Sequence, residues 1–124
     1  MSDFAASVHC MDGRIQESVI KFVQENYGVK YVDTITEPGP NKILAGEGSD
    51  TLVDSIINRL NISVNKHGSE LIFVSGHVDC AGNPVENTVQ FVQIVKSAEF
   101  LQRKYPGVKI VKLWINENWE VEKL

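Results

Sequence analysis

Two short stretches carry the residue types best suited to chemistry, Cys10-Met11-Asp12-Gly13-Arg14 and His77-Val78-Asp79-Cys80. Together they contain both cysteines of the chain and one of its three histidines. Thiolate and imidazole groups suit Zn²⁺, and three protein ligands leave a fourth tetrahedral position open, as catalytic zinc sites require. We therefore predict that Cys10, His77 and Cys80 bind one zinc ion per chain.

The residues that follow Cys10 could act on a water molecule at this open position. Zinc lowers the pKa of a bound water to about 7, which makes hydroxide available at neutral pH. Asp12 could accept a hydrogen bond from that water, and Arg14 could pair with Asp12 and hold its oxygens in place. We predict catalytic roles for Asp12 and Arg14. A purely structural ion pair, or direct ligation of zinc by Asp12, are the alternatives.

Other interpretations of these residues stay open at this point. The two cysteines could be inert buried thiols, a redox pair, or part of a thiolate loop that binds phosphate. Among the other polar residues, His9 should face away from Cys10 on a strand and is interpreted as structural. We expect His67 to be exposed, Asp79 to be structural, and Glu37 to be a solvated loop charge, although Glu37 could also line the crevice.

Length and composition limit the class of protein. The chain has 124 residues, 43% of them hydrophobic, and a net charge of −4. This length fits one domain, residues 1–124, with a real core. The modest negative charge does not indicate a nucleic-acid partner, and no apolar run approaches the ~20 residues of a membrane span. The first residues are too polar for a signal peptide, so we expect a cytoplasmic protein.

Hydrophobic patterning predicts alternating strands and helices. Four apolar runs predict strands at residues 4–9, 31–35, 71–74 and 108–115. Three amphipathic segments predict helices at residues 14–27, from Ser49 or Asp50 to before Gly68, and from Pro84 to before Pro106. The segment from Glu37 to Gly48 is predicted to be irregular, because two prolines flank a glycine at its start.

The third helix has the clearest start signal. Asn83 and Glu86 fit a capping box, and Pro84 suits the first helical position. An apolar stripe runs down one side of this helix, formed by Val85, Val89, Val92, Val95, Ala98 and Leu101.

The order of elements predicts an α/β fold with three α/β/α layers around a mostly parallel sheet. The expected strand order is 2-1-3-4, and residues 119–124 form a short C-terminal edge strand or a tail. Ligands in such sheets bind beyond the carboxyl ends of the strands, where the winding changes direction. Cys10 follows the first strand and His77 the third, so the predicted ligands should meet at one edge of the sheet.

The two stretches resemble the motifs of β-class carbonic anhydrases. That family carries Cys-x-Asp-x-Arg after its first core strand and Gly-His-x-x-Cys after a later one, which stand here as Cys10 to Arg14 and Gly76 to Cys80. The resemblance implies zinc ligation by Cys10, His77 and Cys80, and a pair, Asp12 and Arg14, that orients water. It also implies reversible hydration of carbon dioxide to bicarbonate by zinc-bound hydroxide, and a homodimer or higher homo-oligomer.

Two alternative functions accompany this hypothesis. The family often places a glutamine before its first cysteine, and here no glutamine precedes Cys10. The family loop after the second strand is replaced by Glu37-Pro38-Gly39-Pro40-Asn41. These differences would suit a non-catalytic zinc-binding homologue, or a hydrolase that acts on another small linear molecule such as carbon disulfide.

Overall fold

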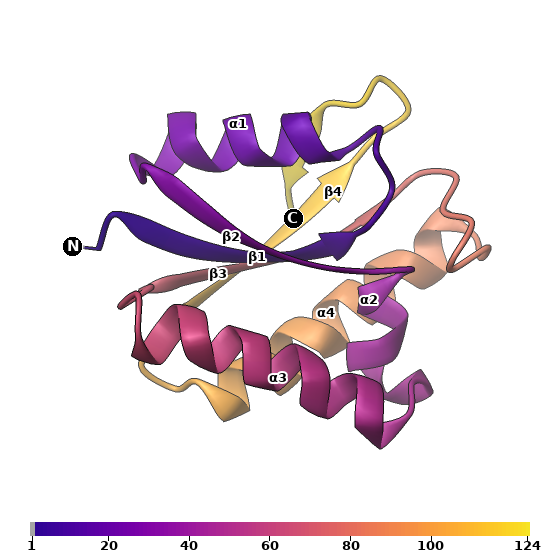
Figure 1. Ribbon diagram of the computed structural model, residues 1–124. Coiled ribbons are helices and arrows are strands. Elements are labelled where there is room, and N and C mark those ends of the chain that lie inside the picture. The colour runs from indigo at the N-terminus through magenta and orange to yellow at the C-terminus, as the bar shows by residue number, and fades with distance from the viewer. Residues whose placement is uncertain (1) are drawn as a thin grey trace.

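A five-stranded sheet runs through the centre of the molecule in the computed structural model, which describes residues 2–124 (Figure 1). The strands are β1 (Phe4–Cys10), β2 (Tyr31–Glu37), β3 (Leu71–His77), β4 (Lys109–Ile115) and β5 (Val121–Lys123). Their spatial order is β2-β1-β3-β4-β5. The first four pair in parallel, and β5 pairs antiparallel with β4. The predicted order and the C-terminal edge strand are confirmed.

Helices cover both faces of the sheet and give the predicted three layers. They are α1 (Gln16–Tyr27), α2 (Pro40–Lys42), the π-helical turn η1 (Ile43–Glu47), α3 (Asp50–Asn65) and α4 (Asn87–Lys104). Helix α1 lies on one face, and α2, α3 and α4 lie on the other (Figure 1). None of the helices within residues 2–124 has the length and hydropathy needed to cross a bilayer.

The central strands β1 and β3 contribute side chains to the hydrophobic cores on both faces of the sheet. Successive side chains of a strand point to opposite faces, so a buried strand needs apolar residues at every position. Ile72 and Val74 of β3 pack into the core beneath α3 and α4, whereas Phe73 packs into the core beneath α1. The unbroken apolar run of β3 therefore reflects its central place, as predicted.

Two helix ends follow simple sequence signals. Helix α1 ends just before Gly28, whose φ of 67° lies in the left-handed region that favours glycine. Helix α3 begins after Ser49, whose hydroxyl accepts a hydrogen bond from the Leu52 backbone N–H. The N-terminal bound of α1 is Gln16 rather than the predicted Arg14, because residues 13–15 form a turn between β1 and this helix.

The segment from Glu37 to Gly48 is more regular than predicted. Strand β2 extends to Glu37, and α2 and η1 occupy residues 40–47. Gly39 adopts a φ of 60°, and a Cβ there would lie 2.7 Å from the Asn83 Cβ, so glycine allows this loop to pack closely. Ile43 and Leu44 are buried in the core, which explains why this short segment is ordered.

The predicted start of the third helix is wrong. Helix α4 begins at Asn87 after Glu86, and the Asn83 side chain is not its cap. Instead, Asn83 is buried and donates to Gln93 Oε1 at 2.6 Å. The Asn83 side chain forms a buried amide pair with Gln93 instead of a capping box. A polar side chain that is buried away from water needs such a partner.

The apolar stripe seen in the sequence of this segment divides into an exposed first half and a buried second half. Ala98 and Leu101 are buried, but the first four members of the stripe are 40–54% exposed: Val85, Val89, Val92 and Val95. The face that packs on the sheet is instead formed by Gln90, Gln93, Ile94, Ser97, Ala98 and Leu101. The glutamines occupy this face because they bind groups of the site described next.

Candidate metal centre

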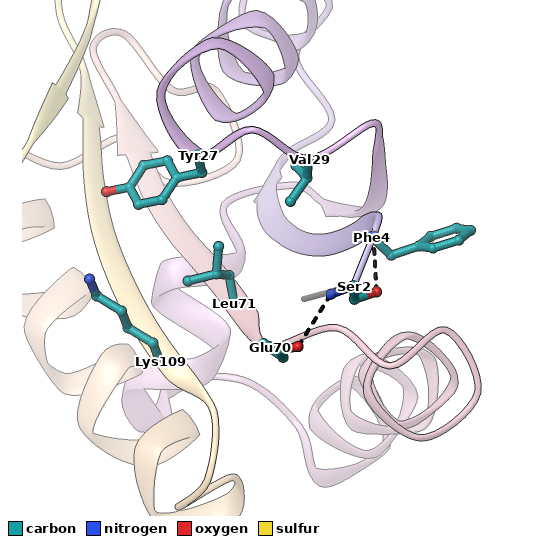
Figure 2. Close-up of a pocket in the computed structure, with 7 residues that line it drawn as sticks. All are labelled: Ser2, Phe4, Tyr27, Val29, Glu70, Leu71 and Lys109. Atoms are coloured by element: carbon teal, nitrogen blue, oxygen red, sulfur yellow. Dashed lines mark hydrogen bonds between the residues drawn. The ribbon is translucent and has the colours of Figure 1, made fainter.

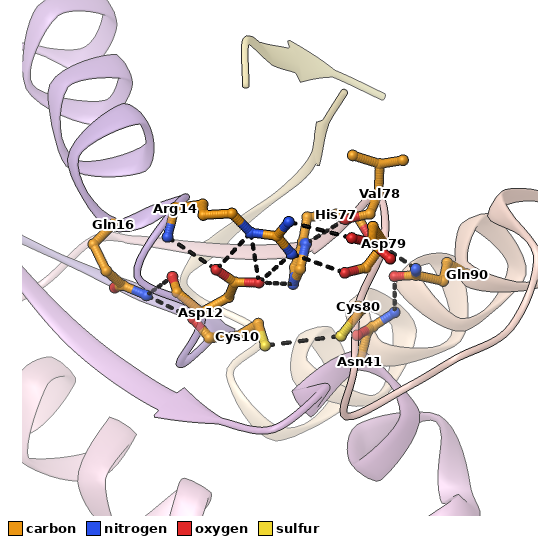
Figure 3. Close-up of polar contacts among 10 residues, drawn as sticks. All are labelled: Cys10, Asp12, Arg14, Gln16, Asn41, His77, Val78, Asp79, Cys80 and Gln90. Carbon is orange, nitrogen blue, oxygen red and sulfur yellow. Dashed lines mark hydrogen bonds and ion pairs between the residues drawn. The ribbon is translucent and has the colours of Figure 1, made fainter. Parts of the chain in front are cut away.

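The ends of β1 and β3 position the candidate ligands. These parallel strands are neighbours, with Val8 opposite Val74 in the register. Cys10 is the last residue of β1 and His77 the last residue of β3, and Cys80 follows three residues later. Because both strands end at the same edge of the sheet, the three side chains converge there (Figure 3).

Cys10, His77 and Cys80 form a cluster of donors that could hold a metal ion. One ligand atom from each lies within 4.8 Å of the others, and the two Sγ atoms are 3.8 Å apart. All three side chains are buried, and His77 is fully so. The prediction that Cys10, His77 and Cys80 lie close together is therefore confirmed.

The His77 imidazole has a free nitrogen aimed at this cluster. Its Nδ1 lies 2.7 Å from the backbone oxygen of Val78, and since a carbonyl only accepts, Nδ1 must donate. The buried Nε2 has no hydrogen-bond partner within residues 2–124. Metal-bound histidines commonly hold their second nitrogen in this way. An unpartnered buried nitrogen beside two sulfurs fits a metal ligand.

The two thiols are hydrogen-bonded to each other. Hydrogen bonding to Cys80 lowers the pKa of the Cys10 thiol, against the raising effect of its burial. Hydrogen bonding to Cys10, together with burial, raises the pKa of Cys80. Burial is the largest single influence and lowers the pKa of His77, but hydrogen bonding to Cys10 and Val78, with the charges of Cys10 and Asp12, makes the net shift upward. The cluster therefore concentrates negative charge on Cys10, where a divalent cation would be stabilised.

Asp12 and Arg14 form an ion pair at the rim of the cluster. Arg14 Nη2 lies 2.7 Å from Asp12 Oδ2, and the Arg14 backbone N–H and Nε also donate to this carboxylate. Hydrogen bonding from Arg14 lowers the pKa of Asp12 to about 2. Asp12 Oδ2 also lies 3.9 Å from His77 Nε2. The pair is thus ionised and lies beside the position that the ligands surround.

A small cavity opens over this rim. Its volume is about 210 Å³, and it is lined by Cys10, Met11, Asp12, Pro38, Ala81 and Gly82. The lining is mostly apolar apart from Asp12, and Met11 is 60% exposed. A cavity of this size would admit a molecule of a few atoms beside the candidate ligands.

Gln16 is a supporting residue that sequence reasoning missed. Its Nε2 donates to the backbone oxygens of Cys10 and Asp12, at 2.8 Å and 2.7 Å. Its Oε1 is therefore the acceptor for His9 Nε2, and His9 Nδ1 accepts from the Ser7 hydroxyl. Burial lowers the pKa of His9. These contacts agree with a structural role for His9, as predicted.

A buried amide network supports the second half of the site and was also missed. Gln90 donates to the backbone oxygen of His77 at 2.8 Å. Gln93 accepts from Asn83 and donates to Glu47, while the Asn83 N–H bonds to the Cys80 oxygen. The signal was present in the sequence, because Gln90 and Gln93 share a helix face with the apolar Ile94 and Leu101.

Three polar residues considered from the sequence lie outside the ligand cluster. Glu37 forms an ion pair with Arg59 of α3. His67 is exposed, as predicted, and bonds to Asp33 at the other end of the sheet. Asp79 is exposed and contacts Arg14 through its carboxylate and its backbone oxygen. Of these three, Asp79 therefore touches the candidate site.

A second cavity lies at the opposite edge of the sheet (Figure 2). It measures about 330 Å³ and is lined by Ser2, Phe4, Tyr27, Val29, Glu70, Leu71 and Lys109. This cavity is larger than the one beside Cys10, but its lining contains no cysteine or histidine. The larger cavity is therefore not where the metal-binding chemistry gathers.

Comparisons with solved structures support the fold. A β-carbonic anhydrase from Trichomonas vaginalis shares 19% identity with a TM-score of 0.63, covering 98% of this chain and 81% of its own. A carbonic anhydrase from Streptococcus mutans shares 17% identity, with the same TM-score and coverage. A tetrameric β-carbonic anhydrase from Sordaria macrospora shares 12% identity with a TM-score of 0.59, covering 99% of this chain and 80% of its own.

Sequence comparison identifies the family. No curated protein matches the chain. The model of the family described as "Putative carbonic anhydrase" matches residues 1–124. This full-length match and the β-carbonic anhydrase fold confirm the resemblance drawn from the two motifs. The chain therefore belongs to this carbonic anhydrase family.

Proposed function

We propose that the protein is a zinc-dependent lyase that catalyses the reversible hydration of carbon dioxide to bicarbonate. One domain, residues 1–124, would carry the whole site. The observation that carries this proposal is the buried cluster of Cys10, His77 and Cys80, in which His77 Nε2 has no hydrogen-bond partner among the described residues. Family membership and the adjacent Asp12–Arg14 pair add support.

In this proposal Cys10, His77 and Cys80 hold the zinc. Two thiolates and one neutral imidazole are a donor set that this metal prefers, and three protein ligands leave room for chemistry. Zinc, when bound, would supply the Lewis acidity that makes hydroxide available at neutral pH. The Val78 oxygen fixes the ring of His77 through Nδ1, so that Nε2 stays directed at the cluster.

Asp12 and Arg14 would orient the attacking oxygen. The low pKa of Asp12 keeps its carboxylate an acceptor at neutral pH. Arg14 occupies both carboxylate oxygens from one side, which fixes the direction in which their remaining lone pairs point. The Asp12 carboxylate would accept a hydrogen bond from the O–H of the nucleophile. This bond would hold the nucleophilic oxygen toward carbon dioxide in the adjacent cavity.

One observation favours a second state of the same site. Asp12 Oδ2 lies only 3.9 Å from the nitrogen proposed to bind zinc. A carboxylate this close could become the fourth ligand and displace water. A protein held in that state would bind zinc without turnover, which is the non-catalytic alternative.

We further propose a cytoplasmic homodimer. Reduced thiols suit a reducing compartment, and Cys10 and Cys80 form no disulfide with each other despite their proximity. Val85 and the three exposed valines of α4 form an apolar surface that a second subunit could cover. Analytical ultracentrifugation of the zinc-loaded protein would measure the oligomeric state directly, and a monomer at micromolar concentration would overturn this part.

The function is tested by stopped-flow hydration of carbon dioxide on protein of known zinc content, from neutral to mildly alkaline pH. We expect about one zinc per chain and hydration that a chelator abolishes. Full zinc occupancy without hydration at any pH would reject the lyase and favour the non-catalytic alternative. Protein that takes up no zinc under reducing, metal-replete conditions would reject both.

A further inference from the structure

Arg14 joins three separate segments at the rim of the site. It pairs with Asp12, its neighbour in the loop after β1. Asp79 lies in the loop after β3. Its carboxylate accepts a hydrogen bond from Arg14 Nη1 at 3.2 Å, and its backbone oxygen accepts one from Nη2 at 3.0 Å. From the turn between β4 and β5, the Trp119 ring lies 4.5 Å from the guanidinium carbon. The guanidinium therefore has neighbours on both its edge and its face.

The backbone of the two distant contacts is unusual. Within residues 2–124, Asp79 and Trp119 are the only non-glycine residues with positive φ, at 55° and 60°. This left-handed region is uncommon for residues with a Cβ, and bulky side chains are rarely found there. Both exceptions contact the same guanidinium. Such outliers concentrate where a structure must hold a functional group.

The Trp119 turn is built to keep its conformation. Asn116 Oδ1 accepts from the backbone N–H groups of Asn118 and Glu120, and the Trp119 N–H bonds to the Asn116 oxygen. These bonds close the turn around Asn116. The ring is consequently presented to Arg14 by a rigid turn rather than by a loose end of the chain.

We infer that Asp79 and Trp119 are positioning residues that hold Arg14 against Asp12. The Arg14 side chain is 45% exposed, so the ion pair alone would leave it free to move into solvent. The Trp119 ring occupies the face of the guanidinium by a cation–π contact, and Asp79 binds its outer nitrogens. The edge that carries Nε and Nη2 is then directed at Asp12. The catalytic consequence rests on the proposed function, whereas the positioning itself does not.

The test compares Trp119→Gly with Trp119→Phe in the zinc-loaded protein. Glycine suits the positive φ but removes the ring, whereas phenylalanine keeps a ring. The main readout is hydrogen exchange of the Arg14 Nε–H, measured by NMR, because this group bonds to Asp12. We expect exchange to accelerate roughly two- to fivefold in Trp119→Gly and to stay near wild type in Trp119→Phe.

Asp79→Gly and Asp79→Asn provide the second pair, on an exposed loop where folding is not at risk. Glycine keeps the backbone conformation and loses the carboxylate, so exchange should accelerate by up to about fivefold. Asparagine keeps an acceptor and should behave more like wild type. Tyr31→Leu is the control for loss of an exposed ring, since Tyr31 stacks on Phe4 at the other end of the sheet.

Zinc content and kcat/KM are measured on the same samples. We expect full zinc in all variants and a fall in kcat/KM that parallels the exchange rate. Unchanged Nε–H exchange in both folded glycine variants would overturn the inference, whatever the activity. Faster exchange in a protein that never hydrates carbon dioxide would support the positioning and reject the proposed function, so the two failures are distinguishable.

Discussion

The candidate ligands and the Asp12–Arg14 pair lie side by side but are held by different means. Cys10, His77 and Cys80 are buried, and two of them are terminal residues of central strands. Asp12 and Arg14 are partly exposed, lie in a turn, and depend on side-chain contacts for their positions. Backbone pairing thus fixes the metal-binding half, whereas a network of polar side chains fixes the half proposed to orient the nucleophile.

This difference predicts which substitutions remove the metal and which remove only turnover. The largest effect is expected for Cys80→Ala and His77→Ala. Each leaves two ligands, so zinc content after dialysis against a mild chelator should fall from about one per chain to near zero. Atomic emission measures this directly. His67→Gln is the matched histidine control, because His67 lies at the other end of the sheet, and it should keep its zinc.

The next effect is expected for Asp12→Asn, which keeps the shape of the side chain and removes its charge. Zinc content should stay near one per chain, while kcat for hydration falls by about a hundredfold or more. Glu17→Gln removes a carboxylate from a surface pair with Lys21 and should leave kcat unchanged. Wild-type turnover in Asp12→Asn would contradict the role given to this residue.

A smaller effect is expected for Gln93→Leu, in the amide network behind the loop that carries Cys80. The substitution leaves Asn83 without its partner, which should lower the free energy of unfolding by about 1–3 kcal/mol. Zinc affinity should fall by about tenfold, because the loop loses support. Urea unfolding and competition with a chromogenic chelator measure the two quantities. Gln24→Leu, at the far end of α1, is the control.

The smallest effect is a pH dependence of stability in the zinc-free protein. The pKa of Asp12 is lowered from its ordinary value near 3.8 to about 2, so the pair stabilises the fold fully above that ordinary value. As pH falls from about 4 to 2, the difference in unfolding free energy between wild type and Asp12→Asn should shrink toward zero. Urea titrations across this range would show it, and a difference that grows with acidity would have the wrong sign.

The buried half of the site was also the predictable half. The sequence predicted that Cys10, His77 and Cys80 lie close together, because they follow the ends of neighbouring parallel strands and are residue types that bind zinc. The glutamines were missed, although the helical period places Gln90 and Gln93 on the face of Ile94 and Leu101, because the groups they bind belong to other segments and are known only from the fold. The exposed valines show a related limit of sequence reasoning. A helical period alone does not determine which face meets the sheet when polar groups compete for it.

The Arg14 contacts were similarly beyond sequence reasoning. Trp119 and Arg14 are 105 positions apart, and the contact depends on a turn whose backbone departs from ordinary preference. Propensities gave no reason to expect a tryptophan at positive φ. Residues that position a functional group through such local exceptions become visible only once the fold is known.

Zinc K-edge X-ray absorption of the purified, zinc-loaded protein tests the central claim most directly. The account predicts two sulfur neighbours at about 2.3 Å and one histidine nitrogen at about 2.0–2.1 Å around each zinc, with one further oxygen or nitrogen neighbour. The Cys80→Ala protein should give no ordered zinc signal of this kind. A wild-type zinc shell without sulfur would contradict the claim that Cys10, His77 and Cys80 hold the metal.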